Sequence, residues 1–174
     1  MASSDKGSNL KEKLKQALVS TARAISDDFK IIEKTNKEKS SKKYDVFEID
    51  NLDSKRDFTK ARAESDSTAL KSKFSSDIVH KKNLPSNTSC KSLYTIAEKI
   101  RYEMLGIKML KGIEINLKEN YSQIINAKKK EKLKSKDDVT ISEAFELYML
   151  KKFLNINLNP LANKMLNFWE KDFD

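Results

Sequence analysis

The chain has 174 residues and a formal net charge of +9, with 38% hydrophobic and 35% charged residues. This length accommodates one domain with a sizeable core, together with a flexible arm. No run of 18 apolar residues is present, which excludes a membrane-spanning class, and the N-terminus lacks the apolar region of a secretory signal. The single cysteine, Cys90, cannot form an internal disulfide, so a cytoplasmic location is expected.

The positive charge raises nucleic-acid binding as a function. The 35 basic residues are 31 lysines and four arginines, whereas arginine is the residue that makes bidentate contacts with phosphates and bases. A general compositional bias toward lysine explains the charge as well. A basic helical nucleic-acid-binding module, with the lysine-rich segment 128–136 as its contact, therefore stays as the alternative hypothesis.

The N-terminal third contains one clear helix and one ambiguous region. Residues 1–8 are small and polar, and we expect them to be disordered. From Asn9 to Asp27–Asp28 a helix is predicted, and its shared face carries Leu10, Leu14, Ala17, Leu18, Thr21, Ala22 and Ile25. In the region 29–49, two short segments rich in aromatic and β-branched residues predict a short two-stranded β flap, with an extended linker as the alternative.

Two helices are predicted ahead of the longest apolar pattern. Asp57 can cap a helix that runs to about Phe74. A short helix over 76–84 is ended by Pro85. A long central helix, about 88–118, then follows, because apolar residues repeat at helical spacing at Leu93, Ile96, Ala97, Ile100, Met104, Ile107 and Leu110. This helix is expected either to continue through Ile125 or to break near Asn120.

Two of the three glycines, Gly106 and Gly112, lie within this central pattern. Glycine inside a helix costs on the order of 1 kcal/mol relative to alanine. We expect this cost to be offset at both positions by the close approach of another backbone, where a side chain would not fit.

The C-terminal part predicts two further helices. Segment 128–138 is a charged, solvated connection. Thr140 and Glu143 have the spacing of a capping box, and Asn159 followed by Pro160 is typical of another helix start. The predicted fold is therefore mainly α, a single helical domain over 9–170, with Trp169 as a core residue and 171–174 as the start of an acidic linker.

The sequence provides little catalytic chemistry. His80 lies one helical turn after Asp77, which suits either a proton-transfer or metal pair, as in a small hydrolase, or a surface hydrogen bond. The surface hydrogen bond is favoured. No HExxH, CxxC or phosphate-loop motif is present, so we predict no catalytic, cofactor-binding or metal-binding residue.

Three charged residues lie on the polar side of the central helix. Arg101 can pair with Glu98 at i,i+3, and Glu103 can reach a neighbouring element. Salt bridges between helices are the favoured interpretation, and a partner-binding patch is the functional alternative.

Together these residues resemble a known family. Glu98, Arg101, Glu103, Gly106, Gly112, Asn116 and Leu117 follow the E-x-x-R-x-E-x-x-G-x5-G-x3-N-L spacing found in the N-terminal region of the CobT subunit of aerobic, ATP-dependent cobaltochelatase. Arg62, Asp66, Ala69, Leu70, Asp77, His80 and Pro85 are similar to its upstream blocks, although Ala63 replaces a glycine. The similarity covers most of the chain and is weakest from Lys30 to Lys55.

The resemblance implies a supporting role in cobalamin biosynthesis. Such subunits work with an AAA+ ATPase, CobS, and a large subunit, CobN, which inserts Co²⁺ into hydrogenobyrinic acid a,c-diamide at the expense of ATP with Mg²⁺. In that family an acidic linker and a von Willebrand A-type domain follow; the resemblance places the start of the linker at 171–174, and no von Willebrand A-type domain is expected within this chain. The resemblance thus implies an enzyme-complex subunit whose N-terminal domain acts through protein–protein assembly and carries no catalysis itself.

Overall fold

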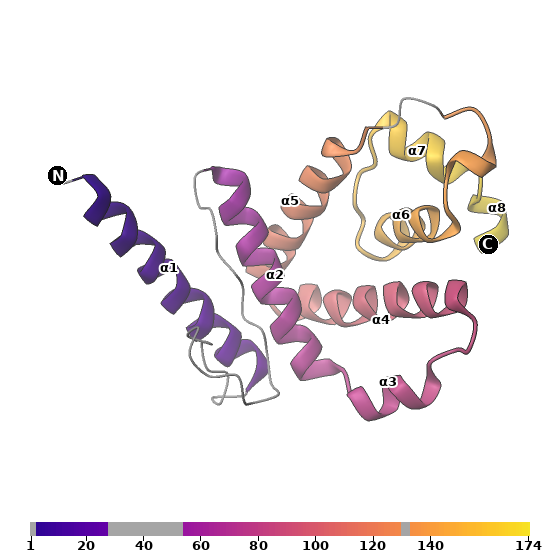
Figure 1. Cartoon of the computed structure of the whole chain (residues 1–174). Helices are drawn as coiled ribbons and strands as arrows, with labels where there is room; N and C mark the ends of the chain where they lie inside the picture. Colours follow the sequence, from indigo (N-terminus) through magenta and orange to yellow (C-terminus); the bar gives the residue numbers. More distant parts are fainter. Residues whose placement is uncertain (1–2, 28–53, 130–132) are drawn as a thin grey trace.

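The computed structural model describes residues 3–27, 54–129 and 133–174, and every regular element within these ranges is a helix (Figure 1). The fold class is mainly α, as predicted. The β flap predicted at 29–49 lies outside the described residues. The helices, in chain order, are α1 (Ser3–Ser26), α2 (Lys55–Phe74), α3 (Asp77–Asn83), α4 (Thr88–Met109), α5 (Lys111–Ala127), the 3₁₀ turn η1 (Lys136–Asp138), α6 (Ile141–Phe153), α7 (Pro160–Asn167) and α8 (Glu170–Phe173).

Helix α1 begins six residues earlier than predicted, at Ser3 instead of Asn9. Residues 3–8, expected to be disordered, are therefore helical. Helix propensity is a weak signal, and neither Gly7, which costs about 1 kcal/mol relative to alanine, nor the serines and Asp5 prevent the helix from extending over them. The helix ends at Ser26, and Asp27 adopts a left-handed conformation with φ 57°. This end agrees with the prediction.

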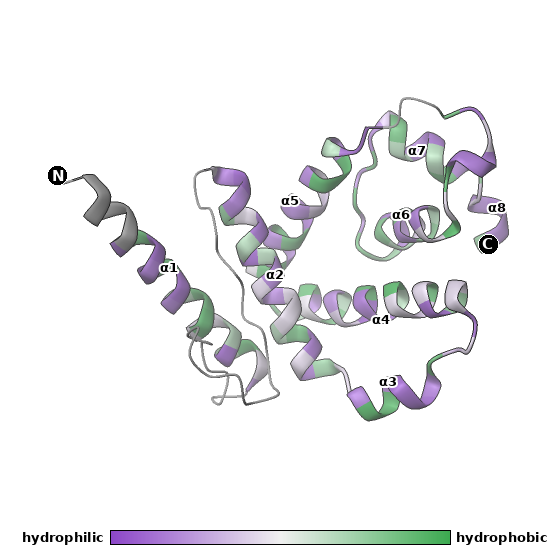
Figure 2. Cartoon of the chain, in the orientation of Figure 1, coloured by the Kyte–Doolittle hydropathy of each residue, from purple (hydrophilic) through white to green (hydrophobic). Residues whose placement is uncertain are grey.

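Helix α2 occupies the middle of the N-terminal half, where it packs against α1, α4 and α5 (Figure 1). Its buried residues are mostly small: Thr59, Ala61, Ala63, Ser65, Asp66, Ala69 and Leu70. Small side chains allow neighbouring helices to approach from several sides. Apolar and polar residues accordingly alternate around α2 without one clean stripe (Figure 2). Its N-cap is Ser54 and Asp57 is the third residue of a capping box, so the predicted cap was placed three residues late.

The predicted central helix 88–118 is divided in two. Leu110, with φ −140° and ψ 123°, ends α4 and precedes α5. Of the two predicted alternatives, neither holds: the helix does not run unbroken through Ile125, and its break lies at Leu110, well before Asn120, after which α5 continues to Ala127. Helices α4 and α5 contact each other, and both contact α2. One straight helix would carry Asn116 of α5 away from Asp66 of α2, to which it is hydrogen-bonded.

The C-terminal helices pack onto α4 through α6. Thr140 and Glu143 form the predicted capping box of α6, and Asn159 caps α7 with Pro160 at its first position. Helix α6 contacts α4, and α7 and α8 both contact α6. Trp169 packs against the core and donates from its indole Nε1 to the carbonyl of Val139 over 3.0 Å.

The last residues fold back onto these helices. Phe173 of α8 contacts the rings of Phe145, Tyr148 and Trp169. Within the described ranges, no helix has both the length and the apolar character needed to cross a bilayer.

Candidate functional site: polar contacts that join α2, α4 and α5

The residues singled out from the sequence gather mainly where α2 meets α4 and α5. They form three separate contacts between helices, and two further residues, Asp77 and His80, lie on α3.

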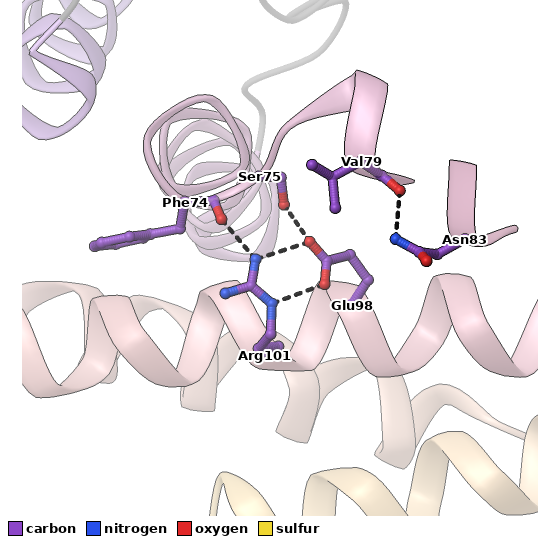
Figure 3. Close-up of polar contacts among 6 residues, drawn as sticks. All are labelled: Phe74, Ser75, Val79, Asn83, Glu98 and Arg101. Atoms are coloured by element: carbon purple, nitrogen blue, oxygen red, sulfur yellow. Dashed lines mark hydrogen bonds and ion pairs between the residues drawn. The ribbon is translucent and has the colours of Figure 1, made fainter. Parts of the chain in front are cut away.

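The first contact joins the end of α2 to α4 through the predicted Glu98–Arg101 pair (Figure 3). Arg101 donates from Nε to Glu98 Oε2 over 2.7 Å and from Nη2 to Glu98 Oε1 over 2.8 Å. Nη2 also donates to the carbonyl of Phe74, at the end of α2, and the Ser75 hydroxyl donates to Glu98 Oε1 over 2.6 Å. A guanidinium at a helix C-terminus satisfies an orphan carbonyl and complements the helix dipole.

The same contact perturbs the acid–base behaviour of both side chains. The hydrogen bonds from Arg101, opposed by partial burial, hold the pKa of Glu98 below its usual value. In return, the hydrogen bond with Glu98 raises the pKa of Arg101. The pair therefore stays ionised and fixes the turn between α2 and α3 onto α4.

The second contact is a buried carboxyl shared by three helices. Glu103 of α4 is 1% exposed and accepts hydrogen bonds from Ser67 of α2 and Tyr121 of α5, each over 2.6 Å. Glu103 does reach neighbouring elements, but it lies in the interior instead of on a solvated polar face. Burial raises its pKa, against the opposing effect of Lys99 and the two hydroxyl donors. Burial and the adjacent Glu103 also raise the pKa of Tyr121.

The third contact pairs Asp66 of α2 with Asn116 of α5. The Asn116 side-chain amide donates to Asp66 Oδ2 over 2.7 Å, and Asp66 is 3% exposed. Burial raises the pKa of Asp66, while the bond from Asn116 and the charge of Arg62 oppose the rise. Arg62 itself is exposed. The bond between Asp66 and Asn116 thus joins α2 to α5 directly.

The two glycines behave differently. A Cβ at Gly106 would lie 2.4 Å from Leu70 Cδ1 and 2.9 Å from Leu70 Cγ, so any larger residue here requires the buried Leu70 side chain to move. The close neighbour is a buried side chain and not the backbone that we predicted. A Cβ at Gly112 would meet nothing within 4 Å. The prediction of close packing at Gly112 is therefore wrong, because the break at Leu110 turns this face of α5 outward.

Asp77 and His80 do not form the predicted surface hydrogen bond. Asp77 is exposed in the first turn of α3, and the His80 ring lies 5.0 Å from the ring of Tyr94 on α4. In the described ranges, no cluster of three or more His, Cys, Asp or Glu side chains has the arrangement of a metal site.

Several contact residues were not singled out from the sequence, namely Ser67, Leu70 as the neighbour of Gly106, Ser75 and Tyr121. Their partners lie 18 to 36 residues away, and only the packing of α2 on α4 and α5 brings them together. Serine and tyrosine residues form no local sequence pattern from which these pairings could be predicted.

The described residues form a mainly helical domain whose polar motif residues connect helices to each other. The sequence matches the family described as cobalamin biosynthesis protein CobT over residues 8–174, and the chain belongs to this family. Membership assigns the chain to cobalamin biosynthesis. Comparison with curated proteins and with solved structures found no significant match.

Proposed function

We propose that this domain is the non-catalytic N-terminal part of a CobT-type cobaltochelatase subunit. It supports ATP-dependent insertion of Co²⁺ into the corrin ring of hydrogenobyrinic acid a,c-diamide. It does so by binding the other subunits, a CobS-type AAA+ ATPase and a CobN-type large subunit. ATP, Mg²⁺ and the cobalt substrate are handled by the assembled complex. The observation that carries the proposal is the family match over residues 8–174.

The use of the polar residues supports a scaffold role. Glu98, Arg101, Glu103, Asp66 and Asn116 each bond to a side chain or carbonyl within the fold. A catalytic acid or base needs access to a substrate proton, and Glu103 and Asp66 are instead buried between helices. Residues engaged in this way set the relative positions of α2, α4 and α5, which a docking surface requires.

Binding to the two proposed partners tests the function. The full chain is mixed separately with the purified AAA+ ATPase subunit and the purified large subunit, with ATP and Mg²⁺, and complexes are measured by calorimetry and size-exclusion chromatography. Saturable binding to at least one subunit is expected. No binding to either, from a chain whose circular dichroism shows it to be folded, would contradict the proposal. Duplex DNA is the comparison ligand, because binding to DNA alone, weakening steeply with salt, favours the nucleic-acid hypothesis instead.

A further inference from the structure

The junction of α4 and α5 exposes an unusual run of residues, which we call the elbow surface: Lys108, Met109, Leu110, Lys111, Gly112 and Ile115. The first five are consecutive and all exposed. Met109, Leu110 and Ile115 retain 39%, 47% and 55% of their accessible surface. Isolated exposed apolar residues are common. Three such residues within a stretch of seven, at the junction of two helices, form a patch of the kind that marks an interaction site.

Gly112 provides a second observation at the same place. It lies in the first turn of α5, where alanine would favour the helix by up to about 1 kcal/mol. Space for a Cβ is open there, and the glycine does not have a positive φ. Neither internal packing nor backbone conformation therefore accounts for glycine at this position. Close approach of a group from outside the chain does account for it, as Leu70 does for Gly106 inside the fold.

The charge around the elbow surface indicates the chemistry of that group. Lys108 and Lys111 are part of the surface, and Lys118 lies two turns further along α5. Glu114 bonds to both Lys111, over 2.6 Å, and Lys118, over 2.8 Å. Glu114 thus offsets one of the two lysines that it contacts, and with Lys108 the three lysines exceed this carboxylate in charge. A partner surface that carries carboxylates around apolar side chains is complementary to this arrangement.

We propose that the elbow surface is the docking site for an acidic segment of a partner subunit, whose apolar side chains cover Met109, Leu110 and Ile115. The partner's backbone passes over Gly112, and its carboxylates face Lys108 and Lys111. This inference rests on the proposed function, since the partner is one of the two subunits named there.

Paired substitutions on two exposed surfaces test the proposal. Ile115→Asp at the elbow is compared with Ile78→Asp on α3, where Ile78 is 81% exposed. Likewise Lys108→Glu is compared with Lys82→Glu on α3, since both lysines are exposed and the net charge changes equally. Each variant is titrated into each subunit by calorimetry, after thermal unfolding has confirmed that it is folded.

The elbow variants are expected to weaken binding to one subunit about tenfold or more, and the α3 variants to leave it within about twofold. Gly112→Gln adds a side chain without charge, and it is expected to weaken binding while leaving the melting temperature unchanged or higher. If the wild-type chain binds a subunit and the elbow variants bind as well as the α3 controls, the elbow proposal is wrong and the proposed function stands. If the wild-type chain binds neither subunit, both fail. Loss of self-association of the chain, instead of subunit binding, would assign the surface to a second copy and overturn the proposal.

Discussion

The crossing of α2 and α4 at Gly106 and the elbow at Gly112 are six residues apart in the sequence, yet their surroundings differ completely. At the crossing, Leu70 occupies the space that a side chain at Gly106 would fill, and the buried Glu103 lies one turn earlier on α4. At the elbow, the space beside glycine is open and the neighbouring apolar side chains are exposed. The same residue type therefore serves internal packing at one position and remains available to a partner at the other.

This difference separates the motif residues into two groups. Glu98, Arg101, Glu103, Gly106 and Asn116 stabilise contacts between helices, so substitutions there should alter the free energy of unfolding. Gly112 and its neighbours should instead alter binding. The expected effects below run from the largest to the smallest.

Glu103→Ala should produce the largest loss of stability, about 3 kcal/mol, because it leaves the Ser67 and Tyr121 hydroxyls without an acceptor and opens a cavity between three helices. Chemical denaturation measures the loss. Glu64→Ala on α2, where the exposed carboxylate only contacts Lys60 at 3.8 Å, is the control and should stay within about 0.5 kcal/mol. Equal effects of the two substitutions would contradict a structural role for Glu103.

The raised pKa of Glu103 also sets a pH dependence. A carboxyl whose folded pKa lies above its unfolded value contributes stability at low pH, and this contribution is lost as the pH rises through the folded pKa. Glu103→Gln removes the titration and can keep hydrogen bonds to both hydroxyls. Its free energy of unfolding, relative to wild type, should therefore rise as the pH increases from about 4, near the unfolded pKa, through the raised folded pKa. A difference that is constant over this range would show that Glu103 does not titrate differently on folding.

Asn116→Ala should cost about 1–2 kcal/mol, because it removes the amide that donates to the buried carboxyl of Asp66. Asn167→Ala, at the exposed end of α7, makes the same chemical change without a buried partner and should be close to neutral. Thermal unfolding of the two variants side by side measures the difference. A neutral Asn116→Ala would mean that the contact between α2 and α5 does not depend on this bond.

Glu98→Gln should have a smaller effect, about 0.5 kcal/mol, since Arg101 keeps 43% of its side-chain surface exposed and solvent screens the pair. The lowered pKa of Glu98 means that its contribution is present above the unfolded pKa and is lost as the pH falls through the folded pKa. The difference from wild type should therefore shrink in acid and in high salt. Persistence of the full difference under acidic conditions would argue against an ionic contribution.

Local signals in the sequence predicted most helix boundaries, whereas tertiary packing decided the rest. The caps at Thr140 and Asn159 and the end of α3 before Pro85 depend on neighbouring residues alone, and all are present. The break at Leu110 depends on the contact of both α4 and α5 with α2, which no local pattern encodes. The apolar repeat continues across that position, so periodicity alone predicted one helix.

The candidate site was predicted in part for the same reason. The Glu98–Arg101 pair is formed within one helix at i,i+3 spacing, and it is present. The partners of Glu103 and Asp66 come from other helices, so the sequence did not identify them. For Gly112, the sequence showed that glycine is unfavourable within a helix. It did not show whether Gly112 packs against the interior or faces solvent, because that depends on the direction of α5.

The free energies of unfolding of Gly106→Ala and Gly112→Ala test the contrast between the two glycines most directly. Gly106→Ala should destabilise the chain by about 1–3 kcal/mol, because the new Cβ collides with the buried side chain of Leu70. Gly112→Ala should stabilise it by up to about 1 kcal/mol, because the helix gains and nothing is displaced. Opposite signs, measured by chemical denaturation under one set of conditions, are the predicted result. Destabilisation of similar size at both positions would contradict the account.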